Sequence, residues 1–119
     1  MFEITKAVNF EAAHFMGGKP EGHPYRNMHG HSFRLEATIA GVVKPGEQWV
    51  EDFGHLTDCL NATAEKLDHR LLNEIDGLDV PTLERICLWV AEDLREALPG
   101  LKRVALARPS LNERCELVL

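Results

Sequence analysis

The chain has 119 residues, 45% of them hydrophobic and 27% charged, and its formal net charge is -6 at pH 7. This acidic balance argues against a nucleic-acid partner, because phosphate binding depends on clustered Lys and Arg side chains. There is no apolar run near the roughly 20 residues that cross a bilayer and no secretion signal at the start, so we expect one cytoplasmic domain over residues 1–119 without a membrane partner.

Two strands with a loop between them are predicted in the first part of the chain. Residues 2–10 are rich in β-formers, and residues 32–40 alternate cleanly between apolar and polar side chains. One face of the second strand carries the apolar side chains Phe33, Leu35, Ala37 and Ile39. The Gly- and Pro-rich segment 17–24 predicts a loop, which could serve as a lid or substrate loop.

Two helices and two more strands are predicted in the rest of the chain. The segment 54–68 has leucines near helical spacing, and a second helix is opened by Pro81-Thr82 and ended by Pro99-Gly100. Its apolar positions recur every three or four residues, at Leu83, Ile86, Cys87, Val90, Leu94 and Leu98. Residues 102–107 and 114–119 are short and apolar, as strands are.

This order, ββααββ, predicts the fold class. Two pairs of strands with two helices inserted between the pairs favour an α+β domain, with both helices on one face of a four-stranded antiparallel sheet. Such a sheet has open edges that tend to pair with another chain. We therefore expect a closed homo-oligomer.

The three cysteines, Cys59, Cys87 and Cys115, are widely spaced and form no CxxC pair. This spacing argues against both a disulfide framework and a zinc site built from thiolates. We expect reduced and mostly buried thiols.

Three histidines form a candidate metal site. Residues two apart on a strand point to the same face, so His29 and His31, separated by Gly30, can aim both imidazoles at one point. His14, from the neighbouring strand, would complete a set of three neutral imidazoles, which holds zinc and leaves one position open for water or substrate. The alternative is a group of ordinary polar histidines.

Five short motifs carry a resemblance to a known family. They are Phe10–His14, His29–Phe33, Asp52-Phe53 after Trp49-Val50, Leu67–His69 followed by Leu72-Asn73, and Pro81–Glu84. In order and spacing they resemble the 6-pyruvoyl-tetrahydropterin synthase family, from Phe2 to about Ala107, and the bacterial 6-carboxytetrahydropterin synthases of queuosine biosynthesis look most similar. One such motif is weak, whereas five in register are specific.

The resemblance implies roles for individual residues. His14, His29 and His31 would bind Zn²⁺, Asp68 and His69 would belong to the catalytic relay, and Thr82 would help to hold the pterin ring. From the residues alone, Asp68-His69 could equally be a cation at a helix C-terminus with a solvated neighbour. His23 and Arg26 lie near enough in sequence to touch the substrate, and Lys19, Arg26 or Arg34 could meet an anionic one.

The resemblance also implies an assembly and a reaction. The family has the tunnelling fold (T-fold), in which ββααββ subunits join their sheets into a barrel with active sites at subunit interfaces. Its usual assembly is a hexamer made of two trimers. The implied activity is that of a zinc-dependent lyase acting on 7,8-dihydroneopterin triphosphate or a related pterin or heterocycle.

Two positions depart from the family pattern. The family's catalytic cysteine, four residues before the HisGlyHis segment, is Tyr25 here. A phenol of pKa about 10 is a poorer base than a thiol of pKa about 8.5. Tyr25 is therefore either a catalytic proton donor or an aromatic residue packed over the entrance, and slow or altered chemistry follows.

The second departure concerns pterin recognition. Where the family has a glutamate that grips the pterin, this chain has Arg108, which offers only hydrogen-bond donors. Either Glu113 supplies the missing carboxylate, or Arg108 selects a ligand with a carboxylate, carbonyl or phosphate. The alternative to a lyase is a catalytically degenerate member that binds zinc and a ligand without turnover.

Overall fold

The computed structural model describes all residues, 1–119. Its strands are β1 (Phe2–His14), β2 (His29–Gly41), β3 (Leu101–Arg108) and β4 (Glu113–Val118), and its long helices are α1 (Phe53–Glu65) and α2 (Leu83–Leu94). Three short 3-10 helices occupy Pro24–Arg26, Leu72–Glu74 and Pro109–Leu111. The predicted order ββααββ is confirmed.

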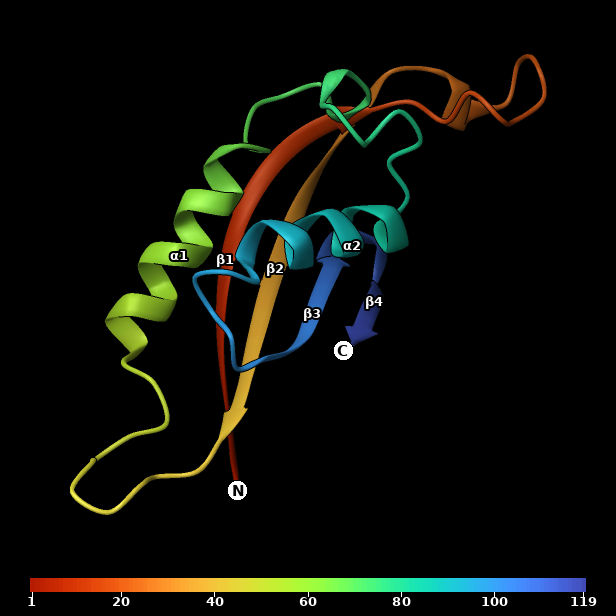
Figure 1. The fold of residues 1–119 in the computed structure, drawn as a ribbon. Coiled ribbons are helices and arrows are strands. Elements are labelled where there is room, and N and C mark those ends of the chain that lie inside the picture. Colours follow the sequence, from red (N-terminus) through yellow and green to blue (C-terminus); the bar gives the residue numbers. More distant parts are fainter.

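The four strands form one antiparallel sheet in the order β1-β2-β3-β4 (Figure 1). Strands β1 and β2 make a long ribbon that is paired without interruption from Phe2↔Gly41 to His14↔His29. Both strands extend beyond the predicted ranges, because pairing continues past the last alternating apolar residues. This extension carries all three histidines into the sheet at one end of the ribbon.

Both helices begin at a capping side chain that accepts a hydrogen bond from a free backbone N–H. Asp52 Oδ1 accepts from the N–H of Gly54 at 2.9 Å, and Thr82 Oγ1 accepts from the N–H of Arg85 at 3.2 Å. Helix α1 ends at Glu65, earlier than the predicted residue 68, and the chain then turns back toward β1. Neither helix is long and apolar enough to cross a membrane.

The core lies between the sheet and the helices. Helix α1 packs over β1, and α2 packs over β3 and β4, on the same face of the sheet (Figure 1). The predicted inward face of β2, Phe33, Leu35, Ala37 and Ile39, is buried there with the leucines of both helices. A fully buried leucine contributes about 1.5–3 kcal/mol to folding relative to an exposed one.

The other face of the sheet is polar and carries no helix. Ion pairs cross it between strands, as where Arg114 Nη2 of β4 lies 2.8 Å from Glu36 Oε2 of β2. The three cysteines are free, as predicted, and only Cys87 is fully buried. Burial raises the pKa of Cys87 to about 12, which keeps it an uncharged thiol at neutral pH.

The segment after α1 borders the outer edge of β1. The N–H of His69 donates to the carbonyl of Glu11 at 2.6 Å, and the N–H of Ala13 donates to the carbonyl of Arg70 at 2.9 Å. A short parallel bridge joins Ala13 to Leu71. Residues 69–71 therefore cover this end of the β1 edge, so that part of the edge is not open to pairing with another chain.

Candidate metal centre

The structure brings His14, His29 and His31 together at the end of the β1–β2 ribbon. Their potential ligand atoms all lie within 4.8 Å of one another. The three side chains share the face that the helices cover farther along the sheet, because His14 continues the inward series of Phe10 and Ala12. The predicted cluster is therefore present, and it can hold a metal ion.

Backbone carbonyls orient two of the rings. His14 Nδ1 lies 3.2 Å from the carbonyl of Pro81, and His29 Nδ1 lies 2.7 Å from the carbonyl of Asn27. A carbonyl only accepts, so in each ring Nδ1 carries the proton and donates it. The lone pair is then at Nε2, which is the second-sphere arrangement that metal-binding histidines use.

Two of the histidines have buried nitrogen atoms without a partner. They are Nε2 of His14 and Nε2 of His31. A buried polar atom without a hydrogen bond is costly, and nearly all such atoms in folded proteins are satisfied. A divalent ion bound by the cluster would satisfy both atoms, so the residues present fit zinc.

The environment favours the neutral form of His14 and His31. Burial lowers the pKa of His14, although its bond to Pro81 opposes the shift. Burial, followed by the charges of His14, Arg108 and His29, lowers the pKa of His31 to about 4. Metal ions bind the neutral imidazole, so this environment favours a ligand over a proton-carrying role.

Asn73 fixes the chain immediately after His14. Its Oδ1 accepts from the N–H of Phe15 at 3.0 Å, and its Nδ2 donates to the carbonyl of Phe15 at 2.9 Å. The same Nδ2 also reaches the carbonyl of Asp79 at 3.4 Å. The Leu72-Asn73 motif therefore holds the segment that positions His14.

A cavity of about 210 Å³ opens on the cluster. Beside the three histidines its polar lining consists of Lys19, Tyr25, Thr82, Glu84, Arg108 and Glu113. Tyr25, Thr82, Arg108 and Glu113 were candidates from the sequence. Glu84 belongs to the Pro81–Glu84 motif but was not predicted as a site residue. Its position as the second residue of α2 is the signal that could have indicated it.

Arg108 and Glu113 form a pair within this cavity. They are opposite each other at the end of the β3–β4 ladder, and Arg108 Nε lies 2.8 Å from Glu113 Oε1. The connection between them turns through Asn112, whose φ of 54° is a left-handed conformation that Asn tolerates. The two residues that were alternatives for pterin recognition, Arg108 and Glu113, are thus partners in one ion pair.

The segment before β2 places Tyr25 at the cavity, but not His23 or Arg26. His23 caps the short helix Pro24–Arg26, because its Nδ1 accepts from the N–H of Tyr25 at 3.1 Å. Its ring also packs edge-on against the Tyr25 ring at 4.8 Å between centroids. Arg26 is exposed and does not line the cavity.

Asp68 and His69 lie at the outer edge of β1 and do not line the cavity at the histidines. His69 Nδ1 is 2.9 Å from Asp68 Oδ2, and Asp68 Oδ1 accepts from the N–H of Glu11 at 2.9 Å. That backbone bond, followed by the bond to His69, lowers the pKa of Asp68. The bond to Asp68 raises the pKa of His69, so the pair favours an ionised carboxylate beside a protonated imidazole.

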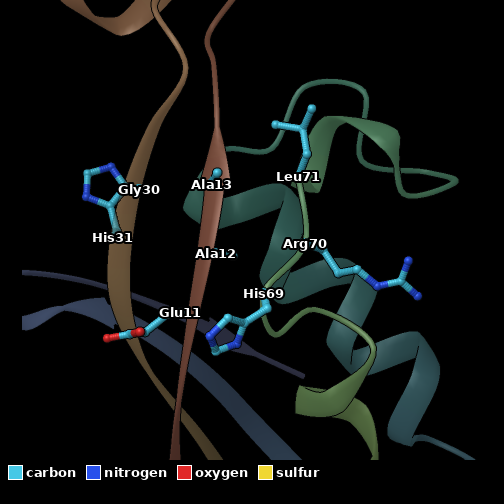
Figure 2. A pocket seen from close by; sticks show the side chains of 8 residues that line it. All are labelled: Glu11, Ala12, Ala13, Gly30, His31, His69, Arg70 and Leu71. Atoms are coloured by element: carbon cyan, nitrogen blue, oxygen red, sulfur yellow. The ribbon is translucent and has the colours of Figure 1, made fainter.

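Figure 2 shows the hollow that His69 borders, with the ring of His69 directed toward β1 and Arg70 directed away from it. The hollow measures about 400 Å³, and the small residues Ala13 and Gly30 and the imidazole-bearing His31 form part of its lining. The imidazole of His69 is 77% exposed and its backbone is left-handed, with φ of 57°. A non-glycine residue held in this conformation is typical of functional sites.

Comparison with known proteins decides the family. The family model described as 6-pyruvoyl tetrahydropterin synthase matches residues 3–118. The chain belongs to this family. The resemblance seen in the five motifs is therefore confirmed over nearly the whole chain.

Curated relatives in the family carry more than one activity in their names. A dihydroneopterin monophosphate aldolase of Pyrococcus furiosus is 41% identical over 87% of this chain and 86% of its own length. A 6-carboxy-5,6,7,8-tetrahydropterin synthase of Synechocystis is 39% identical over 87% and 84%. A putative enzyme of the same name from Archaeoglobus fulgidus is 37% identical over 87% and 85%.

A solved structure shares the fold. The 6-pyruvoyl tetrahydropterin synthase of Caenorhabditis elegans superimposes with a TM-score of 0.86 at 19% identity, and covers 99% of this chain and 95% of its own. The predicted tunnelling fold of the subunit is therefore confirmed. At this identity the likeness concerns the fold alone.

Proposed function

We propose that the protein is a zinc-dependent lyase that cleaves a carbon–carbon bond in the side chain of a phosphorylated 7,8-dihydroneopterin. The histidine cluster carries this proposal, because its two buried, unpartnered Nε2 atoms call for a metal beside a cavity of about 210 Å³. The name of the P. furiosus relative supports the monophosphate as substrate. The pairing of Asp68 with His69, which lowers the pKa of the carboxyl and raises that of the imidazole, supports proton transfer.

His14, His29 and His31 would hold the ion, with His14 and His29 kept in the right tautomer by the carbonyls of Pro81 and Asn27. Bound zinc would supply Lewis acidity, lowering the pKa of the substrate's side-chain hydroxyls. The other residues of the cavity would bind and orient the substrate. Thr82 retains a hydroxyl proton to donate, since its oxygen accepts from Arg85, and the Arg108–Glu113 pair offers both charges to the heterocycle.

The cleavage is of the aldol type, and it needs two proton transfers. The bond between the first and second side-chain carbons breaks, the second hydroxyl loses its proton, and a two-carbon aldehyde leaves with the phosphate. The electron pair stays on the first carbon, conjugated with the pterin ring, and that carbon then takes up a proton. His69 would deliver this proton, with Asp68 stabilising the imidazolium.

We further propose that a second copy of the chain completes the site, in a homo-oligomer such as the hexamer of two trimers. Asp68 and His69 of one copy lie outside the cavity of their own histidines and are exposed. A pair of that kind is available to a neighbouring copy. The edge of β4 and the part of the β1 edge that residues 69–71 leave uncovered offer the means of joining the sheets.

A second candidate is the 6-carboxytetrahydropterin synthase reaction on 7,8-dihydroneopterin triphosphate. Two relatives at 39% and 37% identity carry that name, the second as putative. The presence of Tyr25 rather than a cysteine disfavours it, because none of the three thiols lines the cavity at the histidines.

The test is a product analysis with zinc-loaded protein and each phosphorylated dihydroneopterin in turn. The proposal predicts conversion of the monophosphate to the one-carbon hydroxymethyl pterin and a phosphorylated two-carbon aldehyde, both visible by mass spectrometry. Conversion of the triphosphate alone to the carboxylated product would favour the second candidate. Tight binding of either compound without turnover would instead identify a catalytically degenerate, ligand-binding member.

A further inference from the structure

We infer that Lys19, held by the ring of Tyr25, forms the subsite for the substrate's phosphate and so sets a preference for phosphorylated over unphosphorylated pterins. The inference rests on the proposed function, because it assigns one end of the proposed substrate to one wall of the cavity. The first observation that supports it is the position of Lys19 and Tyr25. Both residues line the cavity at the histidines, and the ring centroids of Tyr25 and His29 lie 6.1 Å apart.

The second support is charge. The cavity contains two cations, and Arg108 is already paired with Glu113 at 2.8 Å. Lys19 has no carboxylate within 4 Å, so its ammonium group is free to pair with an anion. Phosphate groups are bound best by such unpaired cations and by free N–H donors.

The third support is the way the ammonium group is positioned. Lys19 Nζ lies over the Tyr25 ring, 5.7 Å from its centroid, within the range of a cation–π contact. The ring in turn is held against His23, which caps the short helix that carries Tyr25. An otherwise flexible side chain is thereby kept at the cavity wall.

Arg108 and the Lys19–Tyr25 pair lie near different histidines of the cluster. Arg108 is near enough to His14 and His31 for its charge to contribute to their lowered pKa values, after burial as the main cause. Tyr25 lies beside His29. In this assignment the heterocycle meets the Arg108–Glu113 pair, the phosphate meets Lys19, and the reacting side chain lies at the histidines.

This inference also gives Tyr25 a role that needs no proton transfer. Tyr25 acts as a positioning residue for Lys19, through the face of its ring and not through its hydroxyl. Tyr25→Phe keeps the ring and removes the hydroxyl, whereas Tyr25→Leu removes the ring. The two substitutions therefore separate the positioning role from the role of a proton donor.

The experiment measures the dissociation constants of 7,8-dihydroneopterin monophosphate and of unphosphorylated 7,8-dihydroneopterin. It uses the full-length zinc-loaded protein with Asp68→Asn to stop turnover. We expect Lys19→Gln to weaken binding of the monophosphate by about tenfold, the typical worth of a charge-assisted hydrogen bond, without changing binding of the unphosphorylated compound. Lys19→Arg and Tyr25→Phe should retain the preference, Tyr25→Leu should reduce it, and the control Lys44→Gln in a distant exposed loop should leave it unchanged.

Three results would overturn the inference. They are equal affinity of the wild-type cavity for both compounds, an unchanged ratio in Lys19→Gln, and loss of the preference in Tyr25→Phe together with its retention in Tyr25→Leu. A protein that binds neither compound contradicts the proposed function itself, and the phosphate subsite falls with it. The kinetic counterpart is a rise in KM for the monophosphate in Lys19→Gln at nearly constant kcat.

Discussion

The histidine cluster and the Asp68–His69 pair both adjoin strand β1, which carries His14 and whose Glu11 bonds to the pair, and their environments are opposite. Burial lowers the pKa of His14, and it lowers the pKa of His31 to about 4, so these two rings favour the neutral form. His69 is largely exposed and Asp68 is partly exposed, and their mutual bond favours the charged form of both. One region is prepared to bind a metal, and the other is prepared to carry a proton.

The contrast between the cluster and the pair indicates which parts of the proposed active site a single subunit contains. The metal half is complete within the chain, since carbonyls of Pro81 and Asn27 and the amide of Asn73 already orient its ligands or fix the chain beside them. The proton-carrying half is oriented just as well, by Glu11, but it lies outside the cavity that it would serve. A second copy would bring the halves together.

The largest expected effect is the loss of metal on removing a ligand. His29→Ala should lower zinc affinity by more than about a hundredfold, since even loss of an outer-shell partner costs ten- to a hundredfold. Metal content measured after dialysis is the readout. His55→Ala removes an exposed imidazole from α1 and should leave the zinc content unchanged. Equal metal content in both variants would show that the cluster is not the metal site.

The next effect separates the two regions. Asp68→Asn should lower kcat by about 10²- to 10⁴-fold, the usual contribution of a positioned proton-transfer group, while zinc content stays at the wild-type level. Steady-state kinetics and metal analysis on the same preparation test this. A parallel fall in both quantities would mean that Asp68 supports the metal site instead.

The same variant gives a pH prediction. The carboxylate of Asp68 raises the pKa of His69, so the wild-type imidazole keeps its proton to a higher pH than an ordinary histidine and loses it only as the pH rises through that raised value. Asp68→Asn removes the negative charge, so deprotonation should move to lower pH. NMR titration of the His69 ring measures both curves, and coincident curves would contradict the pairing.

A smaller effect is expected from the residue that fixes the chain beside His14. Asn73→Ala removes two hydrogen bonds to Phe15 and should lower the free energy of unfolding by about 1–3 kcal/mol. Zinc affinity should fall by about tenfold, as for other supporting partners. Urea unfolding and zinc titration are the measurements, with the exposed Asn61→Ala as the matched control.

The smallest effect concerns the backbone of His69. Both His69→Gly and His69→Ala remove the ring, but only glycine adopts a φ of 57° freely. The glycine variant should therefore be the more stable of the two by about 1 kcal/mol, the lower end of the cost of this conformation for an L-residue. Equal unfolding midpoints would indicate that the segment relaxes when the ring is lost.

Much of the fold could be predicted from local patterns. The alternation in residues 32–40 and the periodicity from Leu83 to Leu94 correspond to β2 and α2, because burial on one face imposes those periods. Helix α2 ends at Leu94, before the predicted end at Pro99-Gly100, although Leu98 is still buried. The end of α1 could not be predicted. Residues 66–71 continue an apolar pattern through Leu67, yet they turn back to hydrogen-bond with β1, which is a tertiary preference.

The metal site was more predictable than the rest of the cavity. His29 and His31 are two residues apart on one strand, so their common face follows from strand geometry alone. The neighbours Lys19 and Glu84 come from a loop and a helix start, and no local pattern indicates which side of the cluster they reach. The pairing of Arg108 with Glu113 likewise depends on the register of β3 with β4.

The central claim is that one copy supplies the metal cluster and another supplies Asp68 and His69. The direct test is to co-express His29→Ala with Asp68→Asn and to purify the mixed oligomers. If sites are shared, each inactive variant supplies what the other lacks, and random mixing should restore about a quarter of the wild-type activity. Activity no greater than that of the two variants purified separately would contradict the claim.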